Sequence, residues 1–243
     1  MYAPRQRHHQ ERGSAISPDL LIRAAAAAAI AAGALFIGVQ IGHPALDLDF
    51  ITTTEAAVRN TAKVLMTVLA LAGITGMYLS QVRRNGVLGL VGYLILAAGY
   101  LLIMSSTYGL AYVLPPVADT APSYVTDVLH TFSGRATEGD VGVLGTLFQV
   151  QSACYLAGGI VFGVALYRAR VLARWASALL AVGGLVSIAL SVMPDAFYRL
   201  IALPNGIALI GLGVSLWRSQ RQSADQPAPA TAAEGQPEIP AIR

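Results

Sequence analysis

Charged residues and cysteine are scarce in this sequence, and each shortage excludes a class of protein. Only 12% of the 243 residues are charged, whereas about a quarter are charged in a typical soluble domain. Hydrophobic residues make up 55% of the chain and its mean hydropathy is +0.60, so lipid must cover part of its apolar surface. Cys154 is the only cysteine, which excludes an intrachain disulfide and a cysteine-cluster metal site.

The signatures of enzymes and of nucleic-acid-binding proteins are also missing. The chain contains no nucleophile elbow, no phosphate-binding glycine loop followed by lysine, and no paired carboxylates inside an apolar run. Its basic residues do not form one patch with interleaved aromatics, so no nucleic-acid partner is predicted. The centres of the apolar runs hold no ionisable residue, which argues against an ion-driven pump. We therefore predict no catalytic residue and no cofactor.

What the chain does contain is a series of apolar runs, each long enough with its flanks to cross about 30 Å of hydrocarbon. Six such runs are predicted, at residues 18–42, 53–81, 87–105, 142–167, 175–193 and 197–217. The predicted fold class is all-α, an integral membrane bundle of six helices. A six-span domain over residues 17–218 would lie between two disordered cytoplasmic tails, 1–16 and 219–243.

The placement of charge gives these spans a direction. Arginines concentrate in the two tails and in the turns at 82–86 and 168–174, whereas the loops at 43–52 and 106–141 carry more acid than base. Cytoplasmic loops of membrane proteins keep an excess of basic residues, so both termini are predicted to be cytoplasmic. With a single lysine and many alanines, the composition indicates a bacterial genome of high GC content and hence the inner membrane.

Helix ends can be read at several places. Ser17 suits an N-cap and Pro18 the first helical position. Thr52, followed three residues later by Glu55, fits a capping box at the start of the second run. In the last run a helix that began only after Pro204 would be too short to cross, so we predict a helix kinked at this proline.

Two further segments carry polar or amphipathic patterns. Glu55, Arg59 and Lys63 repeat every four residues on one face. This strip is read as an interfacial first turn stitched by ion pairs, or alternatively as the mouth of a site. Apolar residues also recur at four-residue steps within 123–133, which predicts a short amphipathic helix in the outer loop between the third and fourth spans, lying on the membrane surface or capping the bundle.

Glycines on two runs predict close helix packing. Gly86, Gly89 and Gly92 follow one another at three-residue spacing and form a smooth face that another helix could approach. Gly159 and Gly163 form a GxxxG pattern on the fourth run.

Polar residues inside the runs are the candidate site. The fourth run carries most of them, and the first and sixth runs add one each; the set comprises Gln40, Gln149, Gln151, Ser152, Tyr155 and Asn205. They are read as interhelical hydrogen bonds that set helix register, or as an outward-opening ligand pocket under the 123–133 helix. His43 and His130 are an alternative metal or haem site, although no two histidines have the spacing that places ligands on one helix face.

Two stretches of the chain resemble a known group of proteins. The segment Leu69–Tyr78 followed by Arg84–Tyr93, and the closing segment Leu203–Trp217, are similar to those of small multi-pass bacterial membrane proteins. The resemblance implies a multi-pass helical fold over most of the core. It implies no activity, cofactor or catalytic residue.

These observations predict a non-enzymatic membrane protein, either a scaffold or a binding protein. Its expected partner is a membrane lipid, a small apolar molecule, another membrane protein or a second copy of the chain. The alternative is a facilitative transporter of small molecules that uses the polar cluster around Gln149–Tyr155.

Overall fold

The computed structural model describes residues 17–42, 44–190 and 202–224, and these form helices joined by short connections, with no strand among them. The helices are α1 (Pro18–Gly38), α2 (Leu48–Ile51), α3 (Thr54–Leu79), α4 (Val82–Tyr108), the π-helix η1 (Gly109–Val113), α5 (Leu114–Val117), α6 (Pro122–Phe132), α7 (Leu144–Ala169), α8 (Arg174–Leu190) and α10 (Ala202–Ala224).

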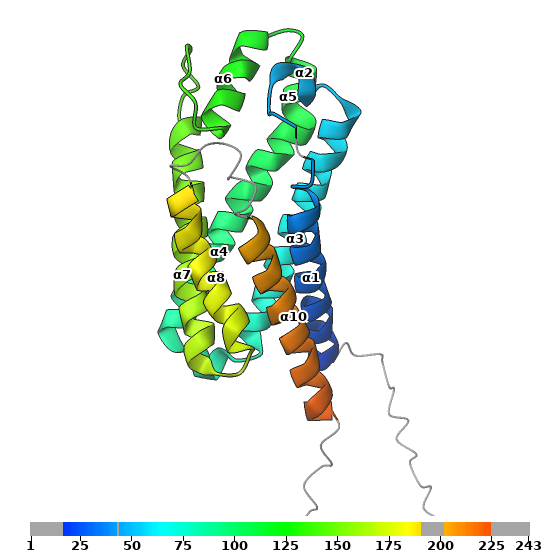
Figure 1. Cartoon of the computed structure of the whole chain (residues 1–243), viewed down its shortest axis with the longest axis vertical. Helices are drawn as coiled ribbons and strands as arrows, with labels where there is room; N and C mark the ends of the chain where they lie inside the picture. The colour runs from blue at the N-terminus through cyan, green and yellow to red at the C-terminus, as the bar shows by residue number, and fades with distance from the viewer. Residues whose placement is uncertain (1–16, 43, 191–201, 225–243) are drawn as a thin grey trace, which may run out of the picture.

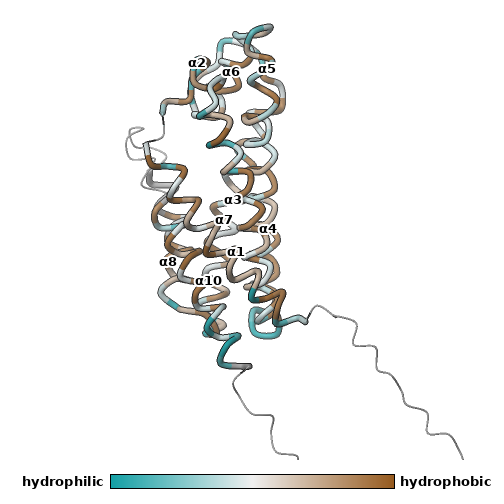
Figure 2. Tube along the Cα trace, turned by 90° about the vertical axis from the view of Figure 1, so that its right-hand side faces the viewer, coloured by the Kyte–Doolittle hydropathy of each residue, from teal (hydrophilic) through white to brown (hydrophobic). Residues whose placement is uncertain are grey.

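The long helices stand side by side in an elongated bundle (Figure 1). α1 packs against α3 and α10, α4 runs along α7, and α8 contacts both α7 and α10. One core cluster joins all six long helices, whereas a second cluster lies where α2, η1, α5 and α6 meet at one end. Hydrophobic residues dominate the middle of the bundle, and hydrophilic residues gather at the C-terminal end of α10 (Figure 2). We call the end with α6 the cap end and the opposite one the arginine end.

Among the described residues, four helical segments are long and apolar enough to cross a membrane: Pro18–Gly38, Thr54–Leu79, Val82–Val117 and Leu144–Ala169. They correspond to the first four predicted runs. Residues 191–201, which hold the end of the fifth run and the start of the sixth, lie outside the described residues. The structure therefore describes only part of the fifth predicted span, as α8, and part of the sixth, as α10.

The helix starts agree with the sequence at Ser17 and differ at Thr52. The Ser17 side chain accepts a hydrogen bond from the Leu20 amide, as predicted for an N-cap. The second predicted cap was wrong by one residue, because Thr53 is the N-cap of α3 and its hydroxyl accepts from the Ala56 amide at 3.1 Å. Thr52 has helical backbone angles at the end of α2, so it cannot take the extended conformation of a cap.

The third span continues beyond the predicted end near residue 105. Helical structure runs from Val82 to Val117, although a proline pair lies near its end. The π-helix η1 directly precedes Pro115 and Pro116, and its wider turn ends with the Leu114 amide bonding to the Gly109 carbonyl. This widening accommodates the proline rings, which would otherwise clash with the preceding helical turn.

Only part of the predicted glycine surface is used. A Cβ on Gly92 would lie 2.5 Å from the Phe162 amide nitrogen, so α4 and α7 touch backbone to backbone there. Gly86 instead faces open space, and its φ of +56° breaks the helical geometry near the start of α4. On α7 the close contact to α4 is made by Gly158 rather than Gly159, while Gly163 approaches Ala181 of α8.

The last helix continues beyond its predicted end, whereas part of the predicted stretch before Pro204 lies outside the described residues. α10 begins at Ala202, so Pro204 lies in its first turn, where a missing amide hydrogen costs no helical bond. Any kink toward residue 197 would involve residues outside those described. α10 also continues to Ala224, so residues 219–224, predicted as tail, are helical.

Candidate functional site

The predicted polar cluster on α7 separates into two faces. Gln151 points toward α4, where its Oε1 accepts a hydrogen bond from the Ser106 hydroxyl at 2.8 Å. Tyr155 lies on the same face, and its ring meets the Tyr100 ring edge to face at a centroid distance of 5.5 Å. Gln149 and Ser152 are exposed on the outer side of the helix. The structure thus brings Gln151 and Tyr155 into the α4–α7 interface and leaves the other two outside it.

The two remaining amides of the set lie elsewhere. Gln40 follows the C-terminus of α1 and is half-buried. Asn205 is buried in α10 and packs against Gly183 of α8, where a glycine Cβ would come within 2.5 Å of its Oδ1. Neither residue lines the cavity that Gln151 reaches.

That cavity lies under α6 and has a volume of about 190 Å³. Its walls are apolar, from Leu110, Val113, Val128 and Phe148 among others, and the Ser106–Gln151 pair forms a polar spot in them. α6 covers the cavity because Val125, Val128 and Leu129 are buried in the second core cluster. A ligand pocket beneath this helix was one of the two predicted roles for the polar cluster, and the geometry allows it.

A carboxylate holds the loop beside this cavity. Asp127 on α6 is buried, and its two oxygens accept hydrogen bonds from the Glu138 and Gly139 amides at 2.9 and 3.0 Å. In the sequence Asp127 is one of the acids of the 106–141 loop, and nothing local distinguishes it from the others. Its fixed geometry makes it a positioning residue for the connection between α6 and α7.

The histidine alternative receives no support from the described part of the chain. His130 is half-buried on α6, and His43 lies outside the described residues. Within the ranges 17–42, 44–190 and 202–224, no three or more His, Cys, Asp or Glu side chains gather in a way that could hold a metal ion.

The polar strip at the start of α3 forms a helix cap. The Arg59 guanidinium pairs with Glu55 at 2.8 Å, as the ion-pair interpretation predicted. It also donates to the carbonyl oxygens of Val39, Ile41 and Gly42 at 3.0 to 3.3 Å. These carbonyls end α1 and have no partner inside that helix, so Arg59 joins the first two spans. A contact over this sequence distance could not be found from local spacing.

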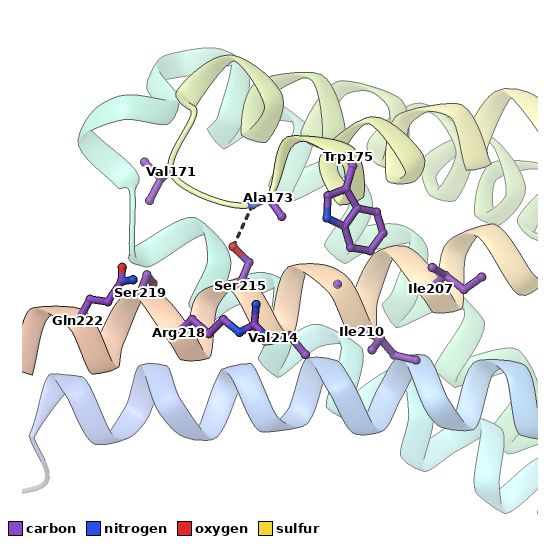
Figure 3. Close-up of a pocket in the computed structure, with 11 residues that line it drawn as sticks. Val171, Ala173, Trp175, Ile207, Ile210, Val214, Ser215, Arg218, Ser219 and Gln222 are labelled. Carbon is purple, nitrogen blue, oxygen red and sulfur yellow. Dashed lines mark hydrogen bonds between the residues drawn. The ribbon is translucent and has the colours of Figure 1, made fainter.

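A larger cavity, of about 530 Å³, lies between α8 and α10 at the arginine end (Figure 3). The Trp175 indole and the side chains of Ile207 and Ile210 form its apolar part. Arg218, Ser219 and Gln222 lie toward its other end (Figure 3). From Ile207 to Gln222 it follows α10 for about 22 Å at 1.5 Å per residue.

The wall of this cavity is tied to the α7–α8 connection. The Ser215 hydroxyl accepts a hydrogen bond from the Ala173 amide at 2.9 Å (Figure 3). Trp175 packs over Gly211, because a Cβ on that glycine would lie within 2.4 Å of the indole. Trp175 and Arg218 lie more than forty residues apart in the chain and share this cavity, which local sequence patterns do not predict. Only the packing of α8 on α10 shows it.

Comparison of the chain with protein families, with curated proteins and with solved structures found no match. The class of the protein therefore follows from its helical fold alone. The part of the chain that the structure describes is all-α, and its four helical segments capable of crossing a membrane fit an integral membrane protein.

Proposed function

We propose that the protein is a six-span protein of the bacterial inner membrane that binds a membrane lipid without chemical conversion. The proposal adds α8 and α10 to the four membrane-capable segments, because both pack in the same bundle and both are mainly apolar. Association with another membrane protein or with a second copy of the chain remains part of this proposal.

The distribution of charge supports the proposed orientation. The arginine end carries Arg23, Arg83, Arg84, Arg168, Arg170, Arg174, Arg218 and Arg221 against Asp19. The cap end carries the acids Asp47, Asp49, Glu55, Asp119, Asp127, Glu138 and Asp140 against the bases Arg59, Lys63 and Arg135. Basic residues remain on the cytoplasmic side, which makes the arginine end, with both ends of the described chain, the cytoplasmic one (Figure 1).

The observation that carries lipid binding is the division of the α8–α10 cavity into an apolar and a basic part. Its volume of about 530 Å³ falls within the roughly 300–1,000 Å³ usual for ligand pockets. An acyl chain would lie against Trp175, Ile207 and Ile210, while a negatively charged headgroup would reach Arg218 and Gln222. Charge complementarity therefore favours an anionic phospholipid over a neutral apolar molecule.

Trp175 offers a direct test, since the chain has only two tryptophans. The full chain with Trp217→Phe, purified in detergent, keeps Trp175 as its sole tryptophan. A phosphatidylglycerol with brominated acyl chains should quench its fluorescence with saturation near one lipid per chain. Filling the cavity with Val214→Phe and Ile207→Phe should raise the half-saturating lipid concentration at least fivefold.

The matched control places two phenylalanines at positions of α8 outside the cavity. Val182 and Leu185 of α8 are about half exposed, at 47% and 55%, and do not line the cavity. Val182→Phe with Leu185→Phe should leave the quenching unchanged. Quenching that rises without saturation, or that both double variants alter equally, would refute a specific lipid site.

A second candidate function rests on the cavity under α6. The Ser106–Gln151 pair in an apolar chamber at the cap end is the feature expected of a facilitative transporter for small neutral solutes. Proteoliposome reswelling in glycerol would test it, with Gln151→Leu as the variant and exposed Gln149→Leu as the control. Flux that falls only with Gln151→Leu supports transport, whereas equal flux with protein-free vesicles argues against it.

A further inference from the structure

The turn between α3 and α4 contains two buried amide side chains without partners. Gln81 is 4% exposed and Asn85 is 5% exposed. The amide nitrogen and oxygen of both side chains are buried, and neither finds a hydrogen-bond partner among the described residues. Burying an amide without a partner is unfavourable, so such groups in a folded protein call for an explanation.

One of these amides lines a cavity that also has two guanidinium groups. Gln81 shares this cavity, of about 460 Å³, with Arg83 and Arg84. Its other walls come from Leu79, Ser80, Val82 and Val171, so no acidic residue is among them. The cavity is therefore electropositive, and the residue beside its two arginines has a buried amide with unused hydrogen-bonding capacity.

The start of α4 adds further donors at the same place. Gln81 is the N-cap residue of α4, and its side chain makes no capping hydrogen bond. Its backbone carbonyl oxygen accepts hydrogen bonds from the Arg84 and Asn85 amides. The amides of Val82 and Arg83 come first in the helix, and such amides have no intrahelical acceptor.

We propose that this turn is a binding site for a phosphate group, held by Arg83, Arg84 and the Gln81 amide. A phosphate has several acceptor oxygens and can engage two guanidiniums, an amide NH₂ and backbone amides together. The surrounding apolar side chains Leu79 and Val82 are 57% and 44% exposed, which places the site at the membrane edge. This location favours a phospholipid headgroup over a soluble phosphate ester as the source.

The positive-inside rule alone does not account for this arrangement. That rule requires basic side chains in the turn, and exposed arginines satisfy it without any buried neighbour. It does not require Gln81 to be withdrawn from water with both polar atoms unpaired. The site is also separate from the α8–α10 cavity, since the two share only Val171 among their lining residues.

Native mass spectrometry of the full chain in detergent tests the proposal with three probes. These are dioleoylphosphatidylglycerol, the uncharged dioleoylglycerol, and glycerol phosphate. The variants are Gln81→Leu and the pair Arg83→Gln with Arg84→Gln. Arg168→Gln with Arg221→Gln is the matched control, because it removes the same charge from the same end without touching this cavity.

In a background whose α8–α10 cavity is filled by Val214→Phe and Ile207→Phe, we expect both site variants to weaken retention of the phosphatidylglycerol at least tenfold while the control keeps it. Dioleoylglycerol should bind to none of these proteins. Displacement by millimolar glycerol phosphate would identify a soluble phosphate ester as the occupant, and no displacement would identify the lipid headgroup. Equal loss in the control and site variants, or full retention in both site variants, would overturn the proposal.

Gln81→Leu also has a readout that separates binding from a structural role. Leucine removes two unpaired polar atoms from a buried position, and this change is neutral or stabilising when no partner is left behind. The lipid-free variant should therefore melt at the same temperature as the original chain or higher, and still lose the phosphatidylglycerol. A lower melting temperature would show that the amide serves folding and would overturn the proposal. The V214F and I207F variants should keep this site, so its failure and that of the α8–α10 site are distinguishable.

Discussion

A close approach between α4 and α7, at Gly92, allows a sharp test of how this bundle is held together. Replacing Gly92 by alanine places a Cβ 2.5 Å from the Phe162 nitrogen and 2.8 Å from its Cα. Both atoms belong to the backbone, so no side chain can rotate away. The helices must separate by about 0.9 Å locally, since ordinary contact begins at 3.4 Å.

The magnitude follows from two opposing effects. Alanine is a better helix former than glycine by about 1 kcal/mol, which favours the variant. Overpacking a tight contact costs about 1–3 kcal/mol, and separation at Gly92 also loosens the neighbouring contacts of Gly99 and Gly158 across the same interface. We expect a net loss of about 1–2 kcal/mol for Gly92→Ala.

Two other helical glycines serve as controls. A Cβ at Gly38 or Gly109 would meet nothing within 4 Å. Gly38→Ala and Gly109→Ala should therefore be neutral or stabilising by up to about 1 kcal/mol. Thermal unfolding of the three variants in one detergent, followed by circular dichroism, gives the comparison. Equal melting temperatures for Gly92→Ala and the two controls would refute backbone-to-backbone packing of α4 on α7.

Three further substitutions test the contacts that connect the helices. Arg59→Gln removes the hydrogen-bond donors for three carbonyls that end α1, so it should lower the free energy of unfolding by about 2 kcal/mol in chemical denaturation. Glu55→Gln leaves those hydrogen bonds in place and should cost under about 0.5 kcal/mol. Asp127→Ala leaves two loop amides without an acceptor, so it should lower the free energy of unfolding by about 1–3 kcal/mol. It should also speed proteolysis within residues 134–143, and unchanged proteolysis would contradict this role. Gln151→Leu removes an interhelical hydrogen bond and should lower the free energy of unfolding by about 0.6 kcal/mol, whereas Gln149→Leu should be neutral. Equal thermal stabilities of the two variants would argue that the hydrogen bond contributes nothing.

Local signals predicted the helices well where the cause is local. The Ser17 cap and the first four apolar runs depend on neighbouring residues only, and the structure has a long helix at each of them. The helical continuation from Tyr108 to Val117 was missed because two prolines normally end a helix, whereas here a π-turn accommodates them. The cap at Thr53 was displaced by one residue because α2, a short helix with no strong periodicity, already includes the turn before it.

The candidate sites, unlike the helices, depend mainly on tertiary packing that the sequence does not show. Four polar residues on one predicted span looked like a cluster, but the helical rotation of α7 directs Gln151 and Tyr155 to α4 and leaves Gln149 and Ser152 outside. Arg59 could be predicted to pair with Glu55 because both lie on α3, yet its bonds to the end of α1 depend on the packing of two spans.

Composition and hydropathy by themselves determined that this is a helical protein with membrane-crossing segments, since a long apolar run must satisfy its own backbone hydrogen bonds in lipid. The arrangement of its arginines predicted an orientation by the same local reasoning. Only the tertiary structure decided which polar groups are buried and which cavities they line. Gln81 lies in the turn between α3 and α4 and Arg218 lies on α10. The cavity at each of them forms where neighbouring segments pack, and no sequence periodicity encodes those contacts.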